Sequence, residues 1–217
     1  MCADAQTGGR GRFDRRWESP PGVNLYLSLL LRPPVDPRQA PQLTLVAAVA
    51  LAKTVEDVAR ISSRLKWPND LYLEGKKAAG ILAEMSTDAD RLRHVVIGVG
   101  LNVNAEAHHF PGPLRKGATS LRMATGRTFR RAEVLARFLD RFAESYREFL
   151  AGGFAPLLPE WSRRSLLTGK RVMVRGPDGD VWGTAAGVDE AGMLLFRRDG
   201  AKGEERLSGG EVLEVGR

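Results

Sequence analysis

A glycine- and arginine-rich segment near the start of the chain has the residue types best suited to hold an anion. Residues 6–17 read QTGGRGRFDRRW, with four arginines among twelve positions. Glycine lets backbone N–H groups approach an anion closely, and the planar guanidinium groups of Arg10 and Arg12 match carboxylate and phosphate oxygens. The segment therefore predicts a loop that wraps a charged small molecule. A flexible, solvated tail is the alternative that this segment alone leaves open.

A second polar stretch, KWPND at residues 66–70, combines a lysine, a proline turn and two short polar side chains. Proline fixes the direction of the chain just where Asn69 and Asp70 appear. An ammonium group at Lys66 could stabilise a carboxylate or a developing phosphate charge, although an isolated lysine is most often exposed to solvent. Asn69 and Asp70 could contact a bound ligand or simply shape the turn.

Two predicted strands leave bare backbone on one face. The strand at residues 78–85 contains Gly80, which would let the backbone pass close to a flat apolar ligand, although a β-bulge is the structural alternative. The strand at residues 93–104 alternates branched apolar residues with Gly98 and Gly100 on the opposite parity. That glycine face could admit a ligand.

The segments between these stretches predict an α+β fold with a mixed or antiparallel sheet packed against helices. Residues 24–32 read as a buried strand, and residues 42–60 have apolar positions at helical spacing. A longer helix is expected at residues 132–150, ending at a Gly-Gly pair. Its expected core stripe consists of Leu135, Phe138, Leu139, Phe142, Tyr146 and Phe149.

The pattern changes in the last quarter of the chain to short strands separated by turns. Strands are expected at residues 170–175, 181–188 and 193–197. Regular spacing of this kind predicts a small β-barrel. We therefore expect two domains, one at residues 1–166 and one at residues 167–217.

The composition is that of a globular chain with a basic surplus. With 217 residues, 43% of them hydrophobic and 27% charged, the chain can form one large domain or a medium domain with a small appendage. No membrane span, signal peptide, internal disulfide or structural metal is expected, because the apolar stretches are interrupted and Cys2 is the single cysteine. These features indicate a cytoplasmic protein. The net charge of +7 comes mainly from dispersed arginines without a helix-turn-helix pattern, so specific DNA binding is not expected.

Three motifs, in order, resemble those of the biotin–protein ligases. That family carries a glutamine, a Gly-Arg-Gly-Arg loop, a tryptophan and an Asn-Leu-Tyr strand in the order seen at residues 6–26. The KWPND block, followed by Lys77 and Gly80, is the second hallmark, and GVGLNVN at residues 98–104 is the third. The resemblance implies a biotin/lipoate ligase-like catalytic domain, related to the class II aminoacyl-tRNA synthetases, followed by a module similar to an SH3 barrel.

The resemblance also implies an ATP-dependent reaction in two steps. The biotin carboxylate would attack the α-phosphate of MgATP to give biotinyl-5′-AMP and pyrophosphate. A lysine of a biotin carboxyl carrier protein, the implied partner, would then take the biotinyl group. ATP and Mg²⁺ are the implied cofactors, and a homodimer is common in the family.

Matching positions carry the family's site residues onto this chain. The implied catalytic residues are Lys66, Arg10 and Arg12. The implied biotin contacts are Gln6, Arg10, Gly11, Arg12, Lys66, Gly80, Ile81 and Leu82. The implied ATP contacts are Arg12, Trp17, Lys66, Asn69 and Asn102. Mg²⁺ would accompany ATP near Asn69 and Asp70, without a site made of protein ligands alone.

The chain departs from the family pattern in two places. Biotin–protein ligases begin this domain with a Ser-Thr-Asn element, which is absent here, so we expect the N-terminal part of the catalytic domain to be missing. Asp14 stands where the family usually has glycine, and aspartate tolerates turn geometry. We also expect residues 6–22 to be mobile without ligand and to become ordered over biotin or the adenylate.

Three alternatives remain at the level of sequence. A lipoate–protein ligase-like enzyme would adenylate a related carboxylate, but the paired Gly-Arg-Gly-Arg and Lys-Trp-Pro-Asn-Asp motifs favour biotin. The absent Ser-Thr-Asn element strengthens a second alternative, a truncated, non-catalytic biotin-binding or dimer-scaffold protein. A biotin-responsive repressor would need an N-terminal DNA-binding domain, for which this chain begins too late.

Overall fold

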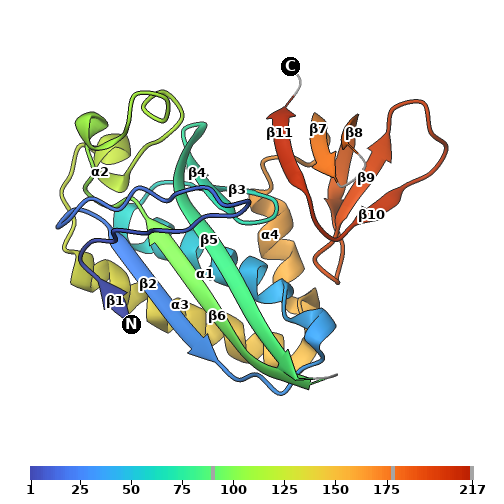
Figure 1. Cartoon of the computed structure of the whole chain (residues 1–217), viewed down its shortest axis with the longest axis horizontal. Coiled ribbons are helices and arrows are strands. Elements are labelled where there is room, and N and C mark those ends of the chain that lie inside the picture. Colours follow the sequence, from blue (N-terminus) through green and yellow to red (C-terminus); the bar gives the residue numbers. More distant parts are fainter. Residues whose placement is uncertain (89–90, 177–178, 216–217) are drawn as a thin grey trace.

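Two antiparallel sheets and a set of helices make up the computed structural model, which describes all residues except 89–90, 177–178 and 216–217 (Figure 1). The larger sheet has six strands in the spatial order β1-β2-β6-β5-β4-β3, with antiparallel neighbours throughout. Its strands are β1 (Cys2–Ala3), β2 (Leu25–Leu31), β3 (Arg64–Lys66), β4 (Asp70–Leu73), β5 (Lys76–Asp88) and β6 (Arg91–Leu101).

Helices cover one face of this sheet and leave the other to the N-terminal loop (Figure 1). The central helix α1 contacts strands β3 to β6 as well as α3. No helix among residues 1–88, 91–176 and 179–215 is long and apolar enough to cross a membrane. The helices are α1 (Gln42–Ala59), α2 (Leu121–Thr125), α3 (Arg131–Gly152) and α4 (Leu158–Arg164), with 3₁₀ turns η1 (Pro37–Gln39), η2 (Ala107–His109) and η3 (Ala155–Leu157).

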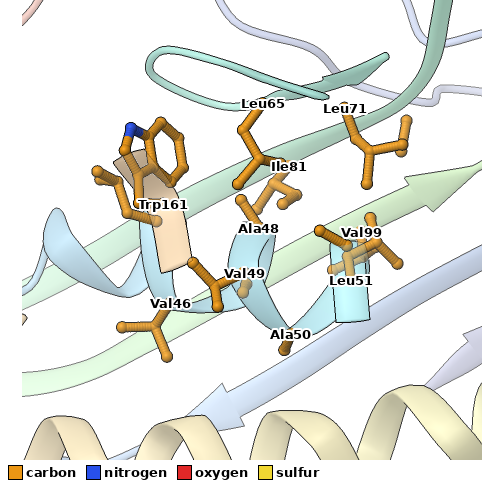
Figure 2. Close-up of a cluster of buried hydrophobic side chains, with 14 of the residues drawn as sticks. Val46, Ala48, Val49, Ala50, Leu51, Leu65, Leu71, Ile81, Val99 and Trp161 are labelled. Carbon is orange, nitrogen blue, oxygen red and sulfur yellow. The ribbon is translucent and has the colours of Figure 1, made fainter. Parts of the chain in front are cut away.

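The main core lies between α1 and the sheet. Small residues of α1 let the helix approach the strands closely, and Figure 2 shows its side chains beside Leu65, Leu71, Ile81 and Val99 of the sheet, with Trp161 of α4 nearby. Each of these side chains is almost completely buried. Burial of one such side chain contributes about 1.5–3 kcal/mol. The core therefore fixes the positions of β4, β5 and β6, the strands that carry the polar motifs.

Strand β6 has the alternation expected from its sequence. Its apolar residues of one parity, including Val95 and Val99, are buried toward the core, whereas Gly98 and Gly100 lie on the opposite face. Gly100 pairs across the sheet with Gly80 of β5. The two strands together form a patch of sheet surface without side chains.

The second sheet has five strands in the order β10-β9-β8-β7-β11 and lies beyond α4 (Figure 1). A small antiparallel sheet at this position is consistent with an SH3-like module. Three of its strands match the expected ones, but β10 and β11 were not expected, because both are short and lie in a polar, glycine-containing region. The strands are β7 (Arg171–Gly176), β8 (Gly179–Val188), β9 (Leu194–Arg198), β10 (Glu205–Leu207) and β11 (Glu211–Val215).

Two details of the expected elements are corrected by the structure. Leu139 was expected in the core stripe of α3 but is 39% exposed. Val134, which was not expected in that stripe, is buried. The buried line runs through Val134, Phe138 and Phe142 at steps of four residues, and Leu139 lies about 100° around the helix from Phe138. The strand β4 was also not expected, because only four residues separate the proline turn from the next turn.

Candidate active site

The glycine- and arginine-rich segment forms an irregular hairpin across the open face of the six-stranded sheet (Figure 1). Arg10 and Arg16 form an antiparallel β-bridge, and the Trp17 N–H donates to the Gly9 carbonyl at 2.9 Å. A Cβ at Gly9 would lie 2.4 Å from the Trp17 carbonyl oxygen. The hairpin can therefore close at this point only because residue 9 is glycine.

Asp14 forms part of the tight turn at the hairpin tip. Phe13 and Asp14 have φ values of 56° and 55°, and the N–H of Arg15 donates to the carbonyl of Arg12 at 3.2 Å. Two successive left-handed residues are the requirement of a type I′ turn, and aspartate tolerates this conformation better than most residues. The departure from glycine at position 14 is thus compatible with a closed turn.

Trp17 follows the hairpin and covers part of the glycine patch. A Cβ at Gly100 would come within 2.5 Å of the indole ring, and one at Gly80 would lie 3.0 Å from it. Lys77 Nζ lies 5.7 Å from the centre of the same ring. Trp17 therefore occupies part of the face expected to admit a ligand, although Gly80, Gly98 and Gly100 all border the neighbouring pocket.

A pocket of about 640 Å³ lies between the hairpin, the glycine-containing face of the sheet, and the strand β11 of the C-terminal sheet. Its volume is within the range of small-molecule sites, about 300–1,000 Å³. The structure brings every residue of the expected site to the wall of this pocket. These residues are Gln6, Arg10, Gly11, Arg12, Trp17, Lys66, Asn69, Asp70, Gly80, Ile81, Leu82 and Asn102.

Lys66 is placed on this wall at the end of β3, just before the proline turn. Burial lowers the pKa of its ammonium group, and the nearby carboxylate of Asp70 opposes that shift. Its Nζ atom lies 5.8 Å from the centre of the Tyr72 ring. Burial also raises the pKa of Tyr72 to about 12, so that phenol stays neutral at physiological pH. Lys66 is thus a partly desolvated cation facing the pocket.

Arg12 and Arg10 occupy different environments. The Arg12 guanidinium donates to Asn69 Oδ1 at 3.4 Å and to the Gly210 carbonyl at 3.1 Å. Burial lowers the pKa of Arg12, although Asp70 and Glu211 oppose the shift from a distance. Arg10 instead forms an exposed ion pair with Glu84 at 2.8 Å. Arg12 is held by neutral oxygens and can therefore offer its charge to an anionic ligand.

The amide side chains of the expected site also hold the protein together. Gln6 Oε1 accepts a hydrogen bond from the Ser19 hydroxyl at 2.7 Å, and Asn69 Nδ2 donates to the Ile81 carbonyl at 3.0 Å. Asn102 is buried; its Nδ2 donates to the Thr119 carbonyl at 3.0 Å. Its Oδ1 accepts from the Asn24 amide at 3.3 Å. These contacts position the pocket wall, and the ligand roles of the three amides stay predictions.

Lys77 and Glu211 are charged pocket residues to which the sequence analysis assigned no role. Lys77 Nζ lies 2.6 Å from Asp70 Oδ1 and is close to Gly80, so its ammonium group faces the same space as Lys66. The sequence feature that could have identified Lys77 as a pocket residue is its position immediately before an apolar strand. Glu211 comes from β11 and forms an ion pair with Arg15 of the hairpin. Nothing near Glu211 in the sequence indicates this contact, because 196 positions separate the two partners.

Taken together, these groups form a cationic pocket over bare backbone. It is lined by six cationic residues, Arg10, Arg12, Arg15, Arg16, Lys66 and Lys77. Such an arrangement can bind two anionic groups side by side and stabilise negative charge that develops between them. The hairpin that carries four of the cations also covers the sheet, and can limit the access of water.

Comparison with known proteins points to one family. Residues 1–102 match the model of the biotin/lipoate A/B protein ligase family. The chain is 43% identical over 196 residues to the bifunctional ligase/repressor BirA of Bacillus subtilis, covering 90% of this chain and 60% of that protein. It is 34% identical over 217 residues to the biotin–[acetyl-CoA-carboxylase] ligase of Paracoccus denitrificans, covering 98% and 88%.

A solved structure shows the same architecture. The biotin protein ligase from Aquifex aeolicus, in complex with biotin and ATP, is 32% identical and superposes with a TM-score of 0.85. The similarity covers 100% of this chain and 88% of that one. By contrast, the chain spans about 60% of the length of the Bacillus relative.

Proposed function

Because the chain belongs to the biotin/lipoate A/B protein ligase family, we propose that it activates biotin with ATP and attaches the biotinyl group to a lysine of a biotin carboxyl carrier protein. The relative from Paracoccus, which aligns with almost the whole chain, is named for this ligation. The Aquifex structure was solved with biotin and ATP. Repression of transcription is not part of the proposal, because the chain spans only part of the bifunctional relative.

The observation that carries the proposal is the convergence of cations from three separate elements on one pocket over the glycine patch. Arg10 and Arg12 come from the hairpin, Lys66 from the end of β3 and Lys77 from the start of β5. A carboxylate and a triphosphate repel each other, and their reaction adds charge at the transferred phosphorus. Fixed cations in a partly desolvated site offset both effects.

In the first proposed step, a biotin carboxylate oxygen forms a bond to the α-phosphorus of ATP. The bond from that phosphorus to the bridging oxygen breaks, and pyrophosphate leaves. In the second step, the neutral ε-amine of the acceptor lysine attacks the carbonyl carbon of biotinyl-5′-AMP, the carbon–oxygen bond to AMP breaks, and the amine loses a proton. The hairpin around Arg12 and Trp17 would keep water from the reactive mixed anhydride.

We assign distinct roles to the cations of the pocket. Lys66 contacts the biotin carboxylate and the adenylate phosphate, because its charge is partly desolvated and has no ion-pair partner within 4 Å in the described structure. Lys77, which is paired with Asp70, assists Lys66 in binding these anionic groups. Arg12 and Arg10 bind phosphate and carboxylate oxygens. Gln6, Gly11, Gly80, Ile81 and Leu82 contact biotin, while Trp17, Asn69 and Asn102 contact ATP.

Mg²⁺ is proposed to enter with ATP. The fit is limited but adequate, because Asp70 offers one carboxylate, already shared with Lys77, and Asn69 offers one amide oxygen. Mg²⁺ commonly takes one or two protein oxygens and completes its coordination with phosphates and water. Bound there, it would neutralise phosphate charge, and Asp70 with Asn69 would orient it.

The remaining parts of the proposal concern organisation. We propose a domain boundary between residues 166 and 167, a cytoplasmic location, and no specific DNA recognition by the described residues. Many arginines support the last point because they are engaged with acids, as Arg137 and Arg141 are with Asp57 at 2.7 Å each. A homodimer is proposed by analogy with the family.

The direct test is pyrophosphate release by the 217-residue chain with MgATP and biotin, with lipoate as a parallel substrate. Biotin-dependent release, followed by biotin transfer to an apo carrier domain, is the expected result. Release of pyrophosphate with lipoate alone would show that lipoate, and not biotin, is the substrate. If neither acid supports release while biotin still raises the melting temperature, the chain binds biotin without catalysis and the proposal is wrong.

A further inference from the structure

A second, smaller pocket shares a wall with the one described above. Its volume is about 240 Å³, below the range of about 300–1,000 Å³ typical of small-molecule sites. Space of this size suits one or two amino-acid side chains. The residues common to both pockets are Arg12, Pro68, Asn69, Ile81 and Leu82.

The lining of the second pocket is mainly apolar. It lies where the N-terminus of α1 and the turn between β8 and β9 approach the C-terminal half of β5, so the larger sheet and loops of the C-terminal module both contribute to it. Met85 is 54% exposed at its mouth. The apolar side chains of the lining include Leu45, Ile81, Ala83, Met85, Val95 and Met193.

Gln42 adds an unsatisfied polar group to this lining. It is 7% exposed at the first turn of α1, and its Oε1 atom is buried without a hydrogen-bond partner among the described residues. Buried acceptors are nearly always paired, because leaving one unpaired is unfavourable. A ligand with an N–H group, together with a small rotation of the carboxamide, would satisfy it.

The pocket also borders an open strand edge. Strand β4 pairs with β5 only as far as Gly80, and Asn69 takes over the edge at Ile81 through two hydrogen bonds of 2.9 and 3.0 Å. Beyond Ile81, β5 pairs only with β6 in the described structure. An extended segment of another protein can add to such an edge through its backbone.

We propose that the second pocket receives an apolar side chain adjacent to the target lysine of the acceptor protein, presented by an extended segment along the free edge of β5. This inference rests on the proposed function and names where its protein substrate docks. The ε-amine of the target lysine must reach an acyl carbon held in the larger pocket. Arg12 and Asn69 line both pockets and contact each other at 3.4 Å. The path between the two pockets is therefore short.

The test separates docking of the protein from formation of the adenylate. Met85→Trp would fill the mouth of the second pocket, and Leu30→Trp is the matched control, because Leu30 is also 54% exposed but lies on β2 outside both pockets. Hydroxylamine serves as a small nucleophile that traps biotinyl-5′-AMP without docking. An apo carrier domain of a biotin-dependent carboxylase serves as the protein acceptor.

For Met85→Trp we expect the KM for the carrier domain to rise at least about tenfold, with hydroxylamine trapping unchanged within about twofold. Gln42→Leu should raise the same KM without lowering the melting temperature, because it removes an unpaired amide. Leu30→Trp should change neither reaction. An unchanged carrier KM in Met85→Trp, or an equal loss of trapping and transfer, would overturn the docking proposal while leaving the ligase function intact. Absence of biotin-dependent trapping in the parent chain would instead remove both proposals.

Discussion

The indole of Trp17 lies directly against Gly100, whose missing side chain is what makes room for it. A Cβ on Gly100 would come within 2.5 Å of the ring, whereas a Cβ on Gly98, two residues earlier on the same strand, would meet nothing closer than 3.6 Å. Both glycines border the pocket, but only Gly100 seats the hairpin through the indole.

This difference predicts opposite outcomes for two alanine substitutions. Gly100→Ala should displace Trp17 and the hairpin, and lower kcat/KM for biotin-dependent pyrophosphate release at least about tenfold, because small misplacements of positioning groups are costly. Gly98→Ala should stay within about twofold. Both melting temperatures should remain near that of the parent, since neither added methyl enters the core. Equal activities in the two variants would show that contact with Trp17 does not position the hairpin.

We expect the charged side chain of Lys66 to lower the stability of the fold and to be required for adenylate formation. Burial lowers its pKa, which means that the surroundings disfavour its charge. Lys66→Met should therefore lower adenylate formation at least about a hundredfold, the scale of one electrostatic donor in a water-excluded site, while the melting temperature stays equal or rises. Lys76→Met is the control, because Lys76 is exposed at the first position of β5. Near-normal pyrophosphate release by Lys66→Met would exclude Lys66 from the active site.

The pH dependence follows from the same pKa shift. The reaction needs the Lys66 ammonium in its charged form, so adenylate formation should fall as pH rises through a pKa below the ordinary 10.5. Lys66→Arg should move this alkaline limb to higher pH, because guanidinium keeps its charge. Stability should change in the opposite direction: between the two pKa values the unfolded chain binds more protons, and unfolding free energy rises with pH. An alkaline limb that is identical in Lys66→Arg would assign it to another group.

The hairpin should exchange its amide protons faster than the sheet that it covers. Its ties to the C-terminal sheet are the ion pair of Arg15 with Glu211 and the hydrogen bond from Arg12 to Gly210. Glu211→Gln should speed exchange over residues 6–22 at most about fivefold, because Arg15 is largely exposed. Biotin with ATP should slow exchange there in the parent chain. Glu204→Gln, which breaks an exposed pair with Arg197, is the control, and equal protection with and without ligands would contradict a mobile hairpin.

Local patterns were sufficient to predict most of the fold. The alternation in β6 gave its buried and bare faces, and the apolar spacing of residues 42–60 predicted α1, which ends at Ala59 with Arg60 in a left-handed conformation. Leu139 was misplaced because sequence shows that a helix has an apolar stripe but not which of two adjacent lines faces its neighbour. Strands β10 and β11 are stabilised by pairing with β9 and β7, which a local pattern does not reveal.

The candidate site was predictable as a set of residues but not as an arrangement. Motif order identified the wall of the larger pocket, and all of its expected residues do line it. The seating of Trp17 on Gly100 and the capture of Arg15 by Glu211 are contacts between distant segments. The first contact depends on how the hairpin folds back over the larger sheet, and the second depends on how the two sheets meet. Lys77 is an intermediate case, because its motif was visible but its pairing with Asp70 required the geometry.

The two ties that hold the hairpin to the C-terminal sheet have a consequence for the order of events during synthesis. Arg12 leaves the ribosome 198 positions ahead of Gly210, and Arg15 leaves it 196 positions ahead of Glu211. Until then the arginines have no anchor in that sheet, although all six strands of the larger sheet have already emerged. A nascent chain would thus acquire a finished pocket only after β11 has emerged. Premature binding of the proposed substrates by an incomplete polypeptide is thereby disfavoured by chain topology itself.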